Sequence, residues 1–125
     1  MIVVDASVLV DAFIGVAAAA TRISGEELHA PHVIDLEVTS ALRRLEAVGQ
    51  VGARDAGRML RALGRADIHR HAHRPLLSRI WALRGNISPY DAAYVTLADV
   101  LDAPLVTTDR RLAEAPSLPC TVELI

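Results

Sequence analysis

The sequence is poor in lysine, in cysteine and in aromatic residues. It contains no lysine, a single cysteine, and one Trp, two Tyr and one Phe. Because Cys120 has no second cysteine to pair with, an intrachain disulfide and a metal cage of thiolates are excluded, and a reducing compartment is expected. With so few aromatic side chains, recognition of a nucleic acid would depend on shape and backbone contacts rather than on base stacking.

Long hydrophobic runs are absent as well. The longest apolar stretch, residues 12–20, is too short to span a bilayer. The first five residues contain no basic side chain and end at an acid, Asp5, which is unlike a secretory signal. These absences predict a soluble, cytoplasmic protein.

The charge of the chain is small overall but unevenly divided. The 125 residues carry a net charge of −2, which is not the strong positive field of a general nucleic-acid binder. The stretch 43–84 holds ten arginines and three acids, about +7, so the remainder carries about −9. Every basic side chain is arginine, whose planar guanidinium suits phosphate oxygens, although GC-rich codon usage explains the same bias.

Hydrophobic periodicity predicts strands that alternate with helices. Short apolar runs predict strands at 2–4, 28–31, 66–69, 104–107 and 121–125, and helical patterns cover 7–14, 17–23, 33–48, 53–63, 76–83, 88–101 and 110–114. In the helix at 76–83, Ile80 and Trp81 are expected to face inward. This alternation indicates one α/β domain over residues 1–125, a three-layer α/β/α sandwich around a parallel sheet of about five strands. Sites in such sheets form at the carboxyl ends of the strands.

Four acids are predicted to meet at this edge. Asp5 ends the first strand, Asp109 closely follows the strand at 104–107, and Asp91 lies in the first turn of the helix that Ser88 begins. Glu37 lies on the apolar face of its helix, where an ionised carboxylate costs several kcal/mol unless it is paired. Helix capping is the alternative explanation for the three aspartates.

A divalent cation explains the four acids together. Carboxylates from separate segments repel one another at one sheet edge, and a hard cation relieves this repulsion. Oxygen ligands without histidine or cysteine favour Mg²⁺ or Mn²⁺, which serve phosphoryl chemistry. The acids at positions 5, 37, 91 and 109 are therefore the candidate catalytic groups.

The same residues carry a resemblance to a known family. The chain resembles the PIN-domain ribonucleases, in particular the VapC toxins of type II toxin–antitoxin systems. The resemblance spans nearly the whole chain and rests on four blocks: DASVLV from Asp5, LEV from Leu36, SPYDAAY from Ser88 and LVTTDRRL from Leu105. The stretch 43–84 contains no signature residue.

The resemblance implies a fold, an activity and partners. It implies a metal-dependent endoribonuclease with a five-stranded parallel sheet, in which Asp5, Glu37, Asp91 and Asp109 hold one or two Mg²⁺ or Mn²⁺ ions. Ser7, Thr107 and Thr108 match supporting hydroxyl positions. Some PIN domains have a further acid where this chain has Arg111, which puts a second ion in doubt. Members are usually homodimers that a cognate VapB-like antitoxin silences, and they cut structured RNA of the tRNA or rRNA class.

Two other patterns remain open. Arginines recur at helical spacing on one face of 53–65 and form either an RNA-binding stripe, with Arg58 and Arg61 at its centre, or a solvated face. His69, His71 and His73 alternate as on one face of a strand, and exposure at a strand end is favoured over a role as metal ligands.

Two rival functions remain possible. One is a non-catalytic PIN-like module that binds RNA or protein. The other is a Mg-dependent phosphatase, which is disfavoured because Ser7 stands where that class has a second Asp, and because the chain has no lysine.

Overall fold

The computed structural model describes residues 1–125 and contains seven α-helices and five strands. The strands are β1 (Ile2–Val4), β2 (Leu28–Pro31), β3 (Ile68–His71), β4 (Leu105–Thr107) and β5 (Val122–Leu124). The helices are α1 (Ala6–Phe13), α2 (Ala17–Ile23), α3 (Ile34–Ala47), α4 (Ala53–Arg65), α5 (Leu77–Ala82), α6 (Pro89–Leu101) and α7 (Arg110–Ala113), and a 3₁₀ turn (Arg74–Leu76) precedes α5.

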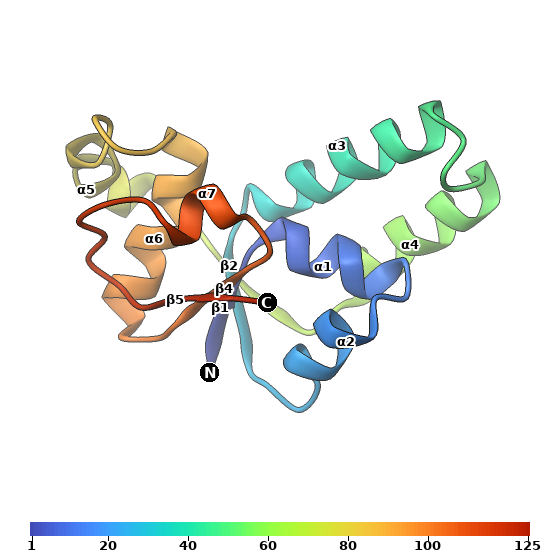
Figure 1. Cartoon of the computed structure of the whole chain (residues 1–125), viewed down its shortest axis with the longest axis horizontal. Helices are drawn as coiled ribbons and strands as arrows, with labels where there is room; N and C mark the ends of the chain where they lie inside the picture. Colours follow the sequence, from blue (N-terminus) through green and yellow to red (C-terminus); the bar gives the residue numbers. More distant parts are fainter.

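All five strands are parallel and lie in the order β3-β2-β1-β4-β5. Helices α1 to α4 lie on one side of this sheet and α5 to α7 on the other (Figure 1). The predicted three-layer α/β/α sandwich with five parallel strands is confirmed.

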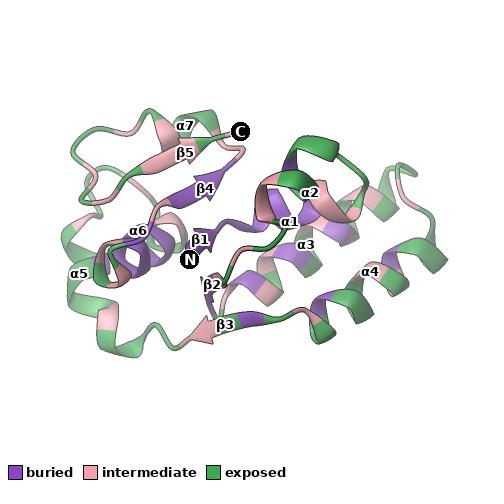
Figure 2. Cartoon of the chain, turned by 90° about the horizontal axis from the view of Figure 1, so that it is seen from below, coloured by how far each residue is buried: buried purple, intermediate pink, exposed green.

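The core lies around the two central strands. Every residue of β1 and β4 is buried, as is a run of seven residues in α6 from Ala92 to Ala98, whereas the outer faces of α3 and α4 are exposed (Figure 2). Strands that are apolar on both faces need cover on both sides, and the two helical layers supply it. The carboxyl ends of β1 and β4 are thus held rigidly beside each other.

Two sequence predictions are corrected by the structure. The third strand begins at Ile68 rather than at Ala66, because its register is set by pairing with β2, where Ile68 lies opposite Leu28. Trp81 is 65% exposed, while its neighbour Ile80 is buried, since adjacent residues of a helix point in different directions. The Arg84 guanidinium lies 4.5 Å from the centre of the Trp81 ring and covers it.

No single helix is long and apolar enough to cross a membrane, although α1 and α2 taken together are, with a bend of 117° between them.

Arg70 on the edge strand β3 forms hydrogen bonds to both α3 and α4. Its Nε donates to both carboxylate oxygens of Asp35 on α3, at 3.0 and 2.8 Å, and one terminal nitrogen donates to the Leu63 carbonyl on α4, at 2.8 Å. The Leu63 carbonyl is in the last turn of α4, where it also accepts from the backbone N–H of Ala66 at 3.2 Å. One side chain therefore positions the start of α3 and the end of α4.

Replacement of Arg70 by Ala is expected to lower the free energy of unfolding by about 2 kcal/mol, because hydrogen bonds to charged groups are lost. Chemical denaturation measures the difference. Arg61→Ala, at an exposed position on α4, is the control and should change stability by less than about 0.5 kcal/mol. Equal changes in the free energy of unfolding for the two substitutions would show that the contacts of Arg70 with α3 and α4 do not stabilise the fold.

Candidate active site

The four acids predicted from the sequence line one pocket of about 430 Å³. Asp5 directly follows β1, Asp109 lies between β4 and α7, and Glu37 and Asp91 lie in the first turns of α3 and α6. The two central parallel strands end at the same edge of the sheet, and α3 and α6 begin there from opposite layers (Figure 1). The structure thus brings together carboxylates from four separate segments.

Asp5 is the most rigidly held of the four. Its side chain is buried, and its Oδ2 accepts hydrogen bonds from the Ser7 hydroxyl at 2.9 Å and from the Thr107 hydroxyl at 2.7 Å. Its backbone N–H donates to the Val106 carbonyl on β4. Both donors converge on one carboxylate oxygen.

The same two hydroxyls also organise the loop after β4. The Thr107 Oγ1 accepts from the backbone N–H of Asp109 at 3.0 Å, and the Ser7 Oγ accepts from the backbone N–H of Thr108 at 3.2 Å. Ser7 and Thr107 therefore link the carboxylate of Asp5 to the backbone that carries Asp109. Thr108 takes part through its backbone N–H.

Capping explains part of the acidic pattern. Asp109 caps α7 by accepting from the backbone N–H groups of Arg111 at 2.9 Å and Leu112 at 3.4 Å. At the start of α6 the capping side chain is that of Ser88, whose Oγ accepts from the Asp91 backbone N–H at 3.2 Å. Asp5 stands before α1 but makes no side-chain cap. The carboxylates of Asp5 and Asp91 are therefore not used as helix caps.

Glu37 is the acid whose surroundings are least compatible with a free charge. Burial raises the pKa of its carboxyl, and the charges of Asp5 and Asp91 raise that pKa further. Its Oε1 is buried without a hydrogen-bond partner. Burial, with Asp5 and Asp109 nearby, also raises the pKa of Asp91.

Tyr94 forms the buried floor beside Glu37. It is fully buried, and its pKa is raised by burial and by the charges of Glu37 and Asp5, so the phenol stays neutral at physiological pH. Neither its hydroxyl nor the Glu37 Oε1 makes a hydrogen bond of normal geometry, but the two groups are close enough for the Tyr94 hydroxyl to oppose the rise in the pKa of Glu37. Tyr94 lies one turn after Asp91 on α6.

The donor set suits a hard divalent cation. The pocket is lined by carboxylates and contains no histidine or cysteine. A cation among these groups would bind the unpartnered oxygen of Glu37 and offset the repulsion that raises two of the pKa values. The residues present therefore fit a metal centre with oxygen ligands.

Sequence reasoning missed two charged residues of the pocket. Asp11 is four residues after Ser7 on α1, and Arg44 is seven residues, two helical turns, after Glu37 on α3. Helical periodicity applied to Ser7 and Glu37 points to both. Arg44 is the one basic residue in the lining.

Other predicted residues lie outside this pocket. Arg58 and Arg61 are exposed on α4 and do not line it, and Arg58 forms an ion pair with Asp55. The Arg111 guanidinium lies 3.5 Å from the Asp109 Oδ2 and is almost fully exposed. Arg70, close to the arginine stripe in sequence, is engaged by Asp35.

Comparison with protein families gives a match over nearly the whole chain. The family model described as "PIN domain" matches residues 2–118. Ribonuclease VapC9 of Mycobacterium tuberculosis is 41% identical over 125 residues, which are 100% of this chain and 98% of the relative. Ribonuclease VapC1 of the same species is 44% identical over 128 aligned residues, covering 98% of this chain and 96% of the relative.

Two solved structures share the fold. PAE2754 from Pyrobaculum aerophilum superposes with a TM-score of 0.70 at 26% identity, covering 96% of this chain and 81% of that one. A chain of a toxin–antitoxin complex from Klebsiella pneumoniae gives a TM-score of 0.70 at 18% identity, covering 97% of this chain and 99% of that one. At this identity the second likeness concerns the fold alone.

Glu37→Gln is expected to raise the melting temperature of the metal-free protein at neutral pH. The pKa of Glu37 is higher in the folded chain than in the unfolded chain, so its ionised carboxylate destabilises the fold. This destabilisation is absent at a pH below 4.5, the pKa in the unfolded chain, and complete at a pH above the pKa in the folded chain. Each unit of upward shift corresponds to about 1.4 kcal/mol.

Thermal unfolding in chelator at several pH values measures this effect. The gain from Glu37→Gln should shrink as the pH falls toward 4.5. Asp55→Asn, at an exposed position on α4, is the control and should show no such gain. A variant that is less stable than the parent at neutral pH would mean that Glu37 is satisfied by the protein itself.

Proposed function

The chain belongs to the PIN-domain family, and from this premise we propose that it is a metal-dependent endoribonuclease of the VapC type, the toxin of a toxin–antitoxin pair, with the acidic pocket as its active site. Its VapC relatives are named as ribonucleases and match it from end to end. The observation that carries the proposal is the convergence of Asp5, Glu37, Asp91 and Asp109 in one pocket, in which a buried Glu37 oxygen makes no hydrogen bond of normal geometry.

Asp5, Glu37, Asp91 and Asp109 would hold the metal, and oxygen-only ligands favour Mg²⁺ or Mn²⁺. Such an ion, when bound, supplies charge that polarises a phosphodiester and lowers the pKa of a water molecule.

The protein's own residues fix the ligands and the substrate around this centre. Ser7 and Thr107 occupy one oxygen of Asp5, which leaves its other oxygen for the ion. The Asp109 Oδ1 is committed to the cap of α7, so coordination would fall to its Oδ2, which would have to give up its 3.5 Å contact with the exposed Arg111 guanidinium. Arg44, the basic residue of the lining, is placed to bind a phosphate of the RNA backbone.

The substrate that we propose is structured RNA of the tRNA or rRNA class. An acidic pocket repels a polyanion, so flanking phosphates need basic surface elsewhere. Arg58 and Arg61 are exposed on α4, which packs beside α3 and thus beside the helix that carries Glu37 (Figure 1). We assign the backbone contacts to this arginine stripe.

The proposed partners are a VapB-like antitoxin and a second copy of the chain, in the cytoplasm. A basic side chain from an antitoxin would gain charge-assisted hydrogen bonds from the partly desolvated carboxylates of Glu37 and Asp91. Large apolar side chains exposed on α5 and at the start of α6, Leu77, Trp81 and Tyr90, support a protein contact on that side of the molecule.

Asp91→Asn is expected to reduce RNA cleavage at least about 100-fold while the fold is retained, because a metal ligand is lost but the Ser88 cap to the backbone of residue 91 remains. The assay is cleavage of folded tRNA and rRNA fragments with Mg²⁺ or Mn²⁺, with and without chelator. Asp99→Asn, at the far end of α6, is the control and should cleave like the parent.

Several outcomes would contradict the proposal. Cleavage by the parent that persists in chelator would exclude a metal-dependent site. RNA binding without any cleavage would favour the non-catalytic module, and release of phosphate from phosphomonoesters instead of RNA cleavage would favour a phosphatase.

Changing Arg58 and Arg61 together to Glu is expected to weaken RNA binding and to flatten its dependence on salt by roughly one unit of log–log slope for each lost phosphate contact. Binding titrations at several salt concentrations measure the slope. The matched control is Arg79→Glu on α5 together with Arg84→Glu just after this helix, across the sheet, which should leave the slope unchanged. An unchanged slope in the α4 variant would identify the stripe as a solvated face.

A further inference from the structure

Three histidines form a stack across the edge of the sheet. His29 on β2 lies opposite His69 on β3, with ring centres 4.7 Å apart, and the centre of the His71 ring is 5.1 Å from that of His29. Arg70, between the two β3 histidines, turns toward α3 and α4. Because side chains alternate along a strand, His69 and His71 lie on the opposite face of β3.

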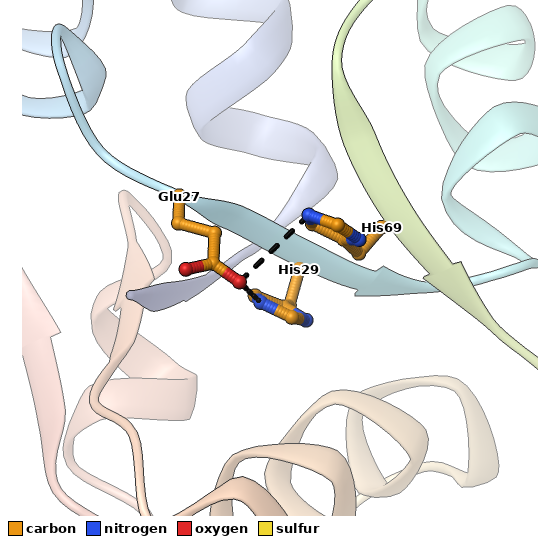
Figure 3. A group of neighbouring side chains, drawn as sticks. All are labelled: Glu27, His29 and His69. Carbon is orange, nitrogen blue, oxygen red and sulfur yellow. Dashed lines mark hydrogen bonds and ion pairs between the residues drawn. The ribbon is translucent and has the colours of Figure 1, made fainter.

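Glu27, just before β2, completes the group. Its Oε1 lies 2.9 Å from the His29 Nε2 and 3.7 Å from the His69 Nε2 (Figure 3). A hydrogen bond accounts for the position of His29, which is buried. It does not account for His69. The His69 side chain is half-exposed and makes no hydrogen bond, yet its ring turns a nitrogen toward the same oxygen.

The three ligand atoms are close enough together to share one ion. They all lie within 4.8 Å of one another. Two ligand atoms in a tetrahedral zinc site, each about 2.0 Å from the ion, are roughly 3.3 Å apart, and the distances of 2.9 and 3.7 Å bracket this value. We propose that Glu27, His29 and His69 form a second metal site, which binds a divalent ion of the Zn²⁺ class and is separate from the acidic pocket.

The ligand types distinguish this site from the acidic pocket. Imidazole nitrogens suit Zn²⁺ and its neighbours Ni²⁺ and Cu²⁺ rather than Mg²⁺, and two histidines with one carboxylate make a known zinc ligand set that leaves a fourth position for water. None of the three residues lines the acidic pocket. They lie toward the amino ends of β2 and β3, whereas the pocket opens at the carboxyl ends of β1 and β4.

His71 serves as a supporting residue for this site. Its Nε2 lies 2.8 Å from the His29 Nδ1. When the Nε2 of His29 binds a metal, the proton of its neutral ring is on Nδ1 and is donated to His71. The Nε2 of His71 is placed to accept this hydrogen bond.

The ion would join the edge strand β3 to β2. Its ligands come from both strands, so binding stabilises the paired state relative to an open edge. The assignment of the acidic pocket as the nuclease centre does not depend on this site.

The test is a titration with Zn²⁺, and with Co²⁺ as a visible probe, of chelator-treated full-length protein that carries no histidine tag. Calorimetry gives the affinity, thermal unfolding gives the stabilisation, and the Co²⁺ absorption reports nitrogen ligands. The variants are Glu27→Gln and His69→Ala, at exposed positions, since His29 is buried and its loss could damage the fold. His73→Ala, outside the cluster, and Asp91→Asn, in the acidic pocket, are the controls.

The parent and both controls should bind Zn²⁺ in this site with a rise in melting temperature. Glu27→Gln and His69→Ala should bind at least about tenfold more weakly and lose that rise, while keeping the circular dichroism of the parent. Zn²⁺ affinity unchanged in both cluster variants, or Zn²⁺ binding lost in Asp91→Asn, would overturn the site. RNA cleavage in Mg²⁺ should persist in His69→Ala, which separates this proposal from that of the nuclease.

Discussion

A buried hydrogen bond from the Thr107 hydroxyl to the Asp5 carboxylate joins the carboxyl ends of the two central strands, and the acidic pocket is organised around it. The register of β1 against β4 makes this bond possible, since Val4 pairs with Val106 and the next residues meet at the sheet edge. Thr107 then accepts from the Asp109 backbone, so the position of one carboxylate determines the position of another. The Ser7 hydroxyl donates to the same carboxylate of Asp5 and accepts from the backbone N–H of Thr108.

Rigidity at this edge has an electrostatic cost. The fold holds Glu37 and Asp91 near Asp5 and partly out of water, so the pKa values of both are raised. A chain selected for stability alone would replace such groups with apolar side chains of similar volume. The retained carboxylates, and the buried Glu37 oxygen without a partner, are instead what a metal centre requires before its ion arrives.

The sequence predicted the parts of the fold and site that depend on local periodicity. Glu37 could be assigned to the pocket side of its helix because Ile34 and Ala41 lie one turn away on the same face. Asp5 and Asp109 could be placed because parallel strands share a carboxyl edge. Periodicity failed where a short helix left the choice of face open, as at Trp81, and where register depended on a partner strand, as at the start of β3.

The histidine group could not be predicted from the sequence, for a different reason. Alternation within β3 identified His69 and His71 as neighbours on one face, but Glu27 and His29 are some forty residues away in sequence. Only the pairing of β2 with β3 brings His29 opposite His69, and no pattern within either segment specifies that register.

The edge of the sheet and the acidic pocket are also mechanically connected. Helix α3 begins three residues after β2 ends, and Asp35 in its first turn is bound by Arg70 of β3, two residues before Glu37. The orientation of Glu37 therefore depends on β3 remaining paired with β2. β3 is an edge strand, so it pairs with the sheet on one side only, through four residue pairs with β2, and its other edge has no strand beside it. Arg70 contacts α3 from one face of β3, and the histidine group contacts β2 from the other face. Both sets of contacts thus help to keep the first turn of α3, and with it Glu37, in position at the pocket.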